Sequence, residues 1–94
     1  MYFFTGVSPE AAEWVSKNRK IYGLGIDTTS LDNGQAVHRK AHQALFRANI
    51  YGLENVANLH MLPASGAFIF ILPMRIKGSC GAPARIIALV PKAN

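Results

Sequence analysis

Two residues whose chemistry suits a metal centre lie close together in the sequence: His42 and Glu54. Imidazole nitrogen and carboxylate oxygen are both suitable ligands for zinc or manganese, and a catalytic zinc usually has three protein ligands and one water. A divalent metal lowers the pKa of its bound water toward ~7 and polarises a substrate carbonyl. Histidine can also act as a general base on that water, so His42 is the candidate catalytic residue.

The residues around this pair predict a helix followed by a strand. Between about 35 and 48, apolar residues recur at helical spacing and basic residues fall opposite them. The predicted apolar face consists of Val37, Ala41, Ala44, Leu45 and Ala48. His42 falls on the border of this face, which suits either a site residue or a helix-boundary histidine without a role. A strand predicted over 50–53 ends beside Glu54, so both groups can meet at one sheet edge.

The rest of the chain predicts one more helix and three more strands. Ser8 and Pro9 begin a helix well, because serine caps and proline fits the first helical position. Strands are predicted over 21–26, 67–72 and 85–90, and the alternating residues 74–77 extend the second of these beyond Pro73. The expected fold class is therefore mixed α/β, with two helices and about four strands.

The apolar run 67–72 predicts a strand that is covered on both faces, because none of its residues is polar. Such a strand needs more layers than 94 residues readily supply. Half of the chain is hydrophobic and 16% is charged, which is too apolar for a disordered tail. The composition thus indicates either missing chain or a partner.

Charge and apolar runs narrow the classes of partner. The net charge is +5, but the lysines and arginines are spread along the chain in runs of two at most. This favours an ordinary basic surface over a nucleic-acid site. Residues 1–6 lack the features of a signal peptide, and the six-residue run 67–72 is too short to cross a membrane. A soluble chain is expected, cytoplasmic or secreted according to what precedes it.

Other polar residues carry weaker signals. His38 could form a two-histidine clamp with His42, but a pair four apart on a helix is more often surface. His60 is interpreted as a loop histidine, and Arg85 as a solvated or structural arginine that could alternatively bind a substrate carboxylate. The polar residues interpreted as turn-forming are Asp27, Ser30 and Asp32. The single cysteine, Cys80, excludes an internal disulfide and has no neighbouring basic pair.

Four pieces of the chain, in this order, resemble the metal-dependent cyclase family that includes the bacterial-type kynurenine formamidases. They are GIDTTSLD at 25–32, HQALFRANIYGLEN at 42–55, LPMRIKG at 72–78 and GAPARIIAL at 81–89. The start SPEAAEW at 8–14 is similar to the animal branch of the family.

The resemblance implies a partial swivelling β/α/β cyclase-like domain that hydrolyses an amide or related acyl bond. In the best-known branch, an arylformamidase of tryptophan catabolism, the substrate is N-formylkynurenine and the product kynurenine. In the family, the residues matching His42 and Glu54 lie at a divalent metal, zinc or manganese. The other ligands come from an upstream His-x-x-x-His-x-Asp motif.

That motif is missing from this sequence. His38 and His42 have the spacing of its two histidines, but Ala44 stands where the aspartate is required. Residues 1–94 are therefore expected to be the C-terminal part of a single cyclase-like domain, inactive alone, whose full-length form is a homo-oligomer acting on a small formamide or amide. The alternative is a non-catalytic truncated isoform that serves as a dimerisation or binding module.

Overall fold

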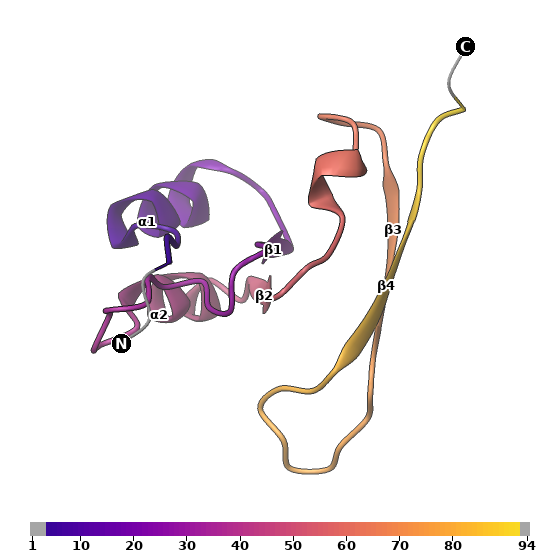
Figure 1. The fold of residues 1–94 in the computed structure, drawn as a ribbon. Coiled ribbons are helices and arrows are strands. Elements are labelled where there is room, and N and C mark those ends of the chain that lie inside the picture. The colour runs from indigo at the N-terminus through magenta and orange to yellow at the C-terminus, as the bar shows by residue number, and fades with distance from the viewer. Residues whose placement is uncertain (1–3, 93–94) are drawn as a thin grey trace. The chain divides into compact units, whose positions relative to one another are not determined.

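The computed structural model describes residues 4–92, which divide into two compact units with the boundary in the sequence between Ala57 and Asn58. Two helices and four strands follow one another along the chain (Figure 1). In order they are α1 (Pro9–Asn18), β1 (Gly23–Gly25), α2 (Lys40–Arg47), β2 (Tyr51–Leu53), a short 3₁₀ helix (Leu59–Met61), β3 (Phe68–Pro73) and β4 (Ala84–Leu89). The predicted mixed α/β class is confirmed.

Helix α1 begins where its local sequence predicts. The side chain of Ser8 accepts a hydrogen bond from the backbone N–H of Ala11 at 3.1 Å, and Pro9 occupies the first helical position. Serine at this place satisfies one of the backbone donors that a helix start leaves free. The helix ends at Asn18, where Arg19 turns to extended backbone.

Strands β1 and β2 form a parallel pair in the first unit, with Gly23 opposite Tyr51 and Gly25 opposite Leu53. The crossover between them contains α2, so the C-terminal ends of both strands meet at one edge of the pair (Figure 1). The core of this unit lies between the helices and the strands. Its buried apolar residues are Ala12, Leu31, Ala41, Ala44, Leu45 and Ile50.

The second helix is shorter than the sequence predicts. It begins at Lys40 instead of about Gln35, because Arg39 has left-handed backbone angles that interrupt helical continuity. Residues 35–38 form turns and bends, and Val37, predicted on the apolar face, is exposed. Ala41, Ala44 and Leu45 are buried as expected, whereas Ala48 lies beyond the helix and is exposed.

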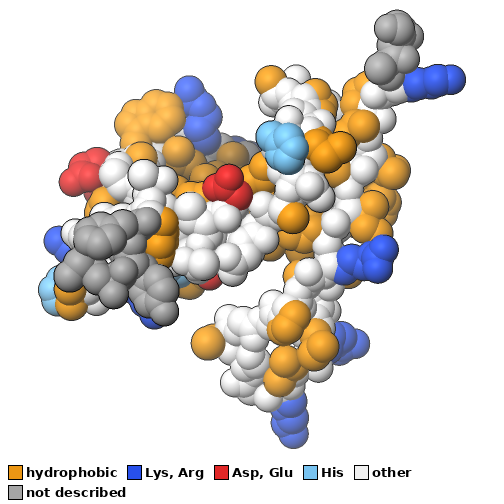
Figure 2. Space-filling view, viewed as in Figure 1, with side chains coloured by type: hydrophobic (Ala, Val, Ile, Leu, Met, Phe, Trp, Pro, Cys, Tyr) orange, Lys and Arg blue, Asp and Glu red, His pale blue; other side chains and the backbone are white. Residues whose placement is uncertain are grey.

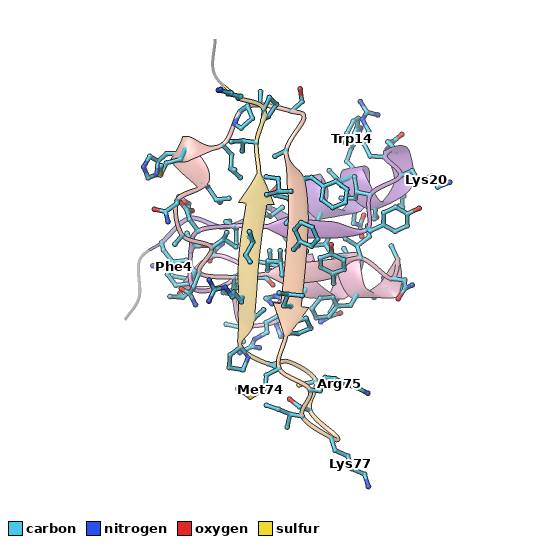
Figure 3. All side chains as sticks on the ribbon, turned by 90° about the vertical axis from the view of Figure 1, so that its right-hand side faces the viewer. Phe4, Trp14, Lys20, Met74, Arg75 and Lys77 are labelled. Atoms are coloured by element: carbon cyan, nitrogen blue, oxygen red, sulfur yellow. The ribbon has the colours of Figure 1, made fainter. Side chains whose placement is uncertain are left out.

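The second unit is built on the antiparallel hairpin of β3 and β4, in which Phe68 pairs with Leu89 and Pro73 with Ala84. The strand predicted over 74–77 is wrong: β3 ends at Pro73, and the ladder closes with the N–H of Met74 donating to Pro83. Residues 75–82 form the connecting loop, with Arg75 and Lys77 pointing away from the strands (Figure 3).

Apolar side chains along the hairpin are exposed. Phe68, Phe70 and Leu72 on β3 and Leu89 on β4 are among them, and hydrophobic side chains gather along this hairpin in the space-filling view (Figure 2). Within its own unit, β3 therefore lacks the two-sided cover that the sequence predicts. A two-stranded hairpin has no further layer to supply such cover.

No helix within residues 4–92 is long and apolar enough to cross a membrane. Residues 1–6 lack the features of a signal peptide in the sequence, and the first three of them lie outside the residues that the structure describes.

Candidate functional site

Three polar side chains from separate segments of the first unit converge on one imidazole. Asp32 lies in the loop after β1, His42 in the first turn of α2, and Glu54 directly after β2. The parallel pairing of β1 with β2 places the loop after β1 beside Glu54, and α2 brings His42 to the same edge. The sequence predicted two of these three residues.

His42 lies between two carboxylates. Its Nδ1 is 2.6 Å from Oδ2 of Asp32, and its Nε2 is 2.8 Å from Oε1 of Glu54. The three side chains differ in exposure: 4% for Asp32, 14% for His42 and 34% for Glu54. The array thus runs from the protein interior toward the surface. Phe46, one turn along α2, packs edge-on against the imidazole with ring centroids 5.4 Å apart.

Asp32 is a helix cap as well as a partner of the ring. Its Oδ1 accepts from the N–H of Ala41 at 2.8 Å, and its Oδ2 from the N–H of His42 at 3.1 Å. Arg39, at the capping position of α2, makes no side-chain cap hydrogen bond. A distant carboxylate therefore takes the role that a local serine or aspartate usually has.

The environment of Asp32 keeps its carboxyl group ionised. Burial by itself raises the pKa of this carboxyl, but hydrogen bonds from the His42 ring and from the N–H groups of Ala41 and His42 outweigh burial. The pKa of Asp32 is consequently lowered from its ordinary value of 3.8. At neutral pH, Asp32 therefore carries a negative charge beside the ring.

Glu54 is anchored independently of His42. The backbone N–H of Leu31 donates to Oε1 of Glu54 at 3.1 Å, and the next residue, Asn55, donates its N–H to the carbonyl of Thr28 at 2.8 Å. These bonds tie the end of β2 to the loop that carries Asp32. The carboxylate is thus held toward the imidazole by the fold itself.

Asp32 is the residue that sequence reasoning missed, having interpreted it as a turn former. Asp27 is exposed in the same loop, and the carbonyl of Ser30 accepts a hydrogen bond from the Thr28 hydroxyl, a contact typical of a turn. His38 is exposed, as the preferred interpretation of a surface residue requires, and it lies in a bend before α2, so it does not share a helix with His42.

The other candidates lie in the second unit. His60 is exposed on the 3₁₀ helix, Arg85 is exposed on β4, and Cys80 is a free, exposed thiol in the loop of the hairpin. None of them has a side-chain partner among the hydrogen bonds and ion pairs of residues 4–92. The exposure of Arg85 agrees with its interpretation as a solvated arginine, whereas His60, interpreted as a loop histidine, lies on a 3₁₀ helix.

An open cavity of about 440 Å³ borders Asp32 in the first unit. It is lined by Phe4, Thr29, Ser30, Asp32, Asn33, Gly34, Ala36 and Arg39. The guanidinium of Arg39 gives this otherwise neutral and acidic lining a positive charge. Sequence reasoning did not single out Arg39 as a residue beside the site.

Within residues 4–92, no group of three or more His, Cys, Asp and Glu side chains is arranged to hold one metal ion. Asp32 contacts the ring nitrogen opposite to the one that faces Glu54, so the two carboxylates cannot bind the same ion. Nε2 of His42 and Oε1 of Glu54 do lie side by side, and both are ligand atoms for a divalent metal. This chain therefore fits two ligands of a metal centre.

No family model matches the chain. Among curated proteins, it is 41% identical over 92 residues to isatin hydrolase of Roseibium aggregatum, an alignment that covers 94% of this chain and 35% of that protein. The chain therefore spans about a third of the length of the curated relative that it matches.

Solved structures show the same relationship. Isatin hydrolase A from Labrenzia aggregata, bound to benzyl benzoate, superposes with a TM-score of 0.86 at 40% identity, over 93% of this chain and 36% of that one. A potential metal-dependent hydrolase with cyclase activity superposes with a TM-score of 0.81 at 28% identity, over 99% of this chain and 45% of the other. The fold is accordingly that of the cyclase-like hydrolases.

Proposed function

Since this chain is homologous to isatin hydrolase, a cyclase-like hydrolase, we propose that it forms part of a metal-dependent enzyme that hydrolyses an amide or related acyl bond. The observation that supports this most directly is the 2.8 Å approach of His42 Nε2 to Glu54 Oε1. It places two ligand atoms of suitable type next to each other on a homologous fold. The role of both residues is part of this proposal.

His42 and Glu54 are the residues of this chain that would hold the metal, zinc or manganese. When bound, such an ion supplies an activated water and polarises the carbonyl of the substrate. Two protein ligands are fewer than a catalytic zinc usually has, so further ligands must come from outside residues 4–92. The missing His-x-x-x-His-x-Asp motif is the set that we expect upstream in a complete polypeptide.

In this proposal, the residues of this chain bind the metal and hold its ligands in a fixed orientation. Glu54 is held by the N–H of Leu31, so its carboxylate needs little reordering to accept a ligand. His42 is held by a hydrogen bond to Asp32 and packs edge-on against Phe46, and both contacts restrict the orientation of its ring. General-base catalysis is the alternative role for His42, in which Nε2 would receive the proton of a water molecule instead of binding the metal.

For the substrate, we propose an amide whose nitrogen is attached to an aromatic ring. Isatin is a cyclic amide of this kind, and N-formylkynurenine, the substrate implied by the sequence resemblance, is an open-chain one. Both reactions add water to an amide carbonyl and release an aromatic amine nitrogen from it. Kynurenine formamidase activity in tryptophan catabolism is the finer form of this proposal.

The test uses the complete polypeptide that contains this chain, assayed with isatin and with N-formylkynurenine. Hydrolysis of either substrate that is lost with a chelator and restored by Zn²⁺ or Mn²⁺ would support the proposal, and the preferred substrate would identify the branch. A complete polypeptide that carries the upstream motif, binds no metal and hydrolyses neither amide would contradict it.

A second candidate function is a non-catalytic module that binds another subunit, including a second copy of this chain. Exposed apolar side chains on both strands of the hairpin favour it, because such patches mark interaction surfaces. The test is sedimentation of the 94-residue chain at micromolar concentration. A monodisperse monomer that unfolds cooperatively would count against this module, whereas a defined oligomer would support it.

A further inference from the structure

Asp32 contacts the first turn of α2 at three points, and two of these contacts define what its oxygens do. The N–H of Ala41 donates to Oδ1 at 2.8 Å, and the N–H of His42 donates to Oδ2 at 3.1 Å. A backbone N–H can only donate, so both oxygens of this carboxylate act as acceptors. The residue is buried, with 3% of its surface exposed.

The third contact then fixes the proton of the imidazole. Nδ1 of His42 lies 2.6 Å from Oδ2 of Asp32, a distance typical of a strong charge-assisted hydrogen bond. Since Oδ2 accepts, Nδ1 must carry the hydrogen. A neutral imidazole has one donor nitrogen and one acceptor nitrogen, so Nε2 is left with its lone pair.

That lone pair faces a second acceptor. Nε2 lies 2.8 Å from Oε1 of Glu54, which already accepts from the N–H of Leu31. Two acceptor atoms this close need a proton or a metal cation between them. The contact of Asp32 with Nδ1 thus leaves the lone pair of Nε2 free to bind a cation.

We propose that Asp32 is a positioning residue that fixes the tautomer of His42, holding the proton on Nδ1 so that Nε2 is available to a divalent cation. Carboxylates have this role beside histidine ligands of metals in general, where they set ring orientation and ligand strength. The assignment of the proton stands on the contacts of this chain alone, whereas its consequence for metal binding rests on the proposed function.

The alternative is that Asp32 only caps the helix. Both roles predict a loss of stability when the side chain is removed, so stability cannot distinguish them. Replacing the carboxylate with an amide can. With the amide oxygen accepting from the N–H of Ala41, the NH₂ group takes the place of Oδ2 and donates to Nδ1, which then becomes an acceptor. Asp32→Asn is therefore expected to move the ring proton to Nε2.

The experiment records the ¹⁵N resonances of the His42 ring in the complete polypeptide without metal, at alkaline pH where the ring carries a single proton, and they are assigned by their loss in His42→Ala. The wild-type protein should show a proton on Nδ1, and Asp32→Asn should show it on Nε2. Asp27→Asn is the matched control, because Asp27 lies exposed in the same loop, and it should leave the wild-type pattern unchanged. Circular dichroism shows whether each variant keeps its helices.

The second measurement is Zn²⁺ binding by calorimetry on the same proteins. Asp32→Asn should weaken binding by about 10- to 100-fold, and Asp27→Asn should not change it. A wild-type ring without a proton on Nδ1, or a folded Asp32→Asn protein with an unchanged tautomer, would overturn the proposal. The wild-type spectrum decides the question even if Asp32→Asn does not fold. Failure of the wild-type protein to bind Zn²⁺ would instead contradict the proposed function.

Discussion

Asp32 and His42 are joined twice, at the backbone N–H of His42 and at its ring Nδ1, both through the same carboxylate oxygen. The start of α2 and the orientation of the imidazole are consequently fixed by one buried group. A shift of the sequence by one residue along the helix would carry His42 about 100° around its axis and away from Glu54. The geometry of the site therefore depends on the position at which Asp32 holds the first turn of α2.

Replacing His42 with alanine should reduce amide hydrolysis by the complete polypeptide much more than it reduces stability. We expect kcat/KM to fall by about 100-fold or more, because the variant loses a predicted metal ligand or, in the alternative role, a general base. The free energy of unfolding should fall by about 1–2 kcal/mol, since Asp32 keeps its two backbone donors. Steady-state kinetics and chemical denaturation measure the two effects.

His38→Ala is the control for this variant, because His38 is exposed and lies outside α2. It should leave both quantities close to wild type. Equal losses of activity in the two variants would contradict the assignment of His42 to the site.

Replacing Glu54 with glutamine should weaken the binding of Zn²⁺ to the complete polypeptide by about tenfold or more. The amide oxygen of the new side chain can still accept from the N–H of Leu31, so the free energy of unfolding should change by less than about 1 kcal/mol. Calorimetric titration with Zn²⁺ gives the affinity. Glu10→Gln on α1 removes the same charge away from the site and should leave the affinity unchanged; equal effects would indicate a general loss of negative charge.

The sequence predicts features that depend on neighbouring residues better than features that depend on residues distant in the sequence. Helix α1 begins as predicted, because Ser8 and Pro9 act on their immediate neighbours. Helix α2 begins five residues later than predicted, because its cap is Asp32, eight residues before Lys40 in the sequence. The apolar spacing around residue 37 continues the helical pattern beyond the point where Arg39 interrupts the backbone.

The same distinction applies to the site. His42 and Glu54 are recognisable from residue type and from their places after predicted elements, and the structure brings them together. Asp32 has the sequence context of a turn, and its contact with His42 arises only when the loop after β1 folds against α2. In the hairpin, Pro73 marks the end of β3, but the alternation of residues 74–77 does not distinguish a strand from a loop.

Acid should destabilise the protein partly through Asp32. The folded-state pKa of this carboxyl is lowered from 3.8, so its contribution to stability is present above pH 3.8 and is lost as pH falls through the folded-state pKa. Chemical denaturation between pH 7 and pH 2 should therefore show a loss of stability below about pH 4 that is smaller in Asp32→Asn. Asp27→Asn should follow the wild-type curve; the same reduced loss in both variants would rule out a specific role for Asp32.

Replacing Arg39 with glycine should stabilise the protein. Arg39 has φ 47° and ψ 49°, a left-handed conformation that costs a side-chain-bearing residue about 1–2 kcal/mol and glycine almost nothing. Glycine also loses more chain entropy on folding, so we expect a net gain of about 0.5 kcal/mol in the free energy of unfolding.

The control is Lys40→Gly, one residue into α2, which should instead lower the free energy of unfolding by up to about 1 kcal/mol. If the helix ran from about 35, as the apolar spacing suggests, Arg39 would lie in its interior and both glycines would destabilise. Chemical denaturation of the two variants therefore tests where α2 begins. A gain in the free energy of unfolding for Arg39→Gly supports a start at Lys40, and a loss supports an earlier start.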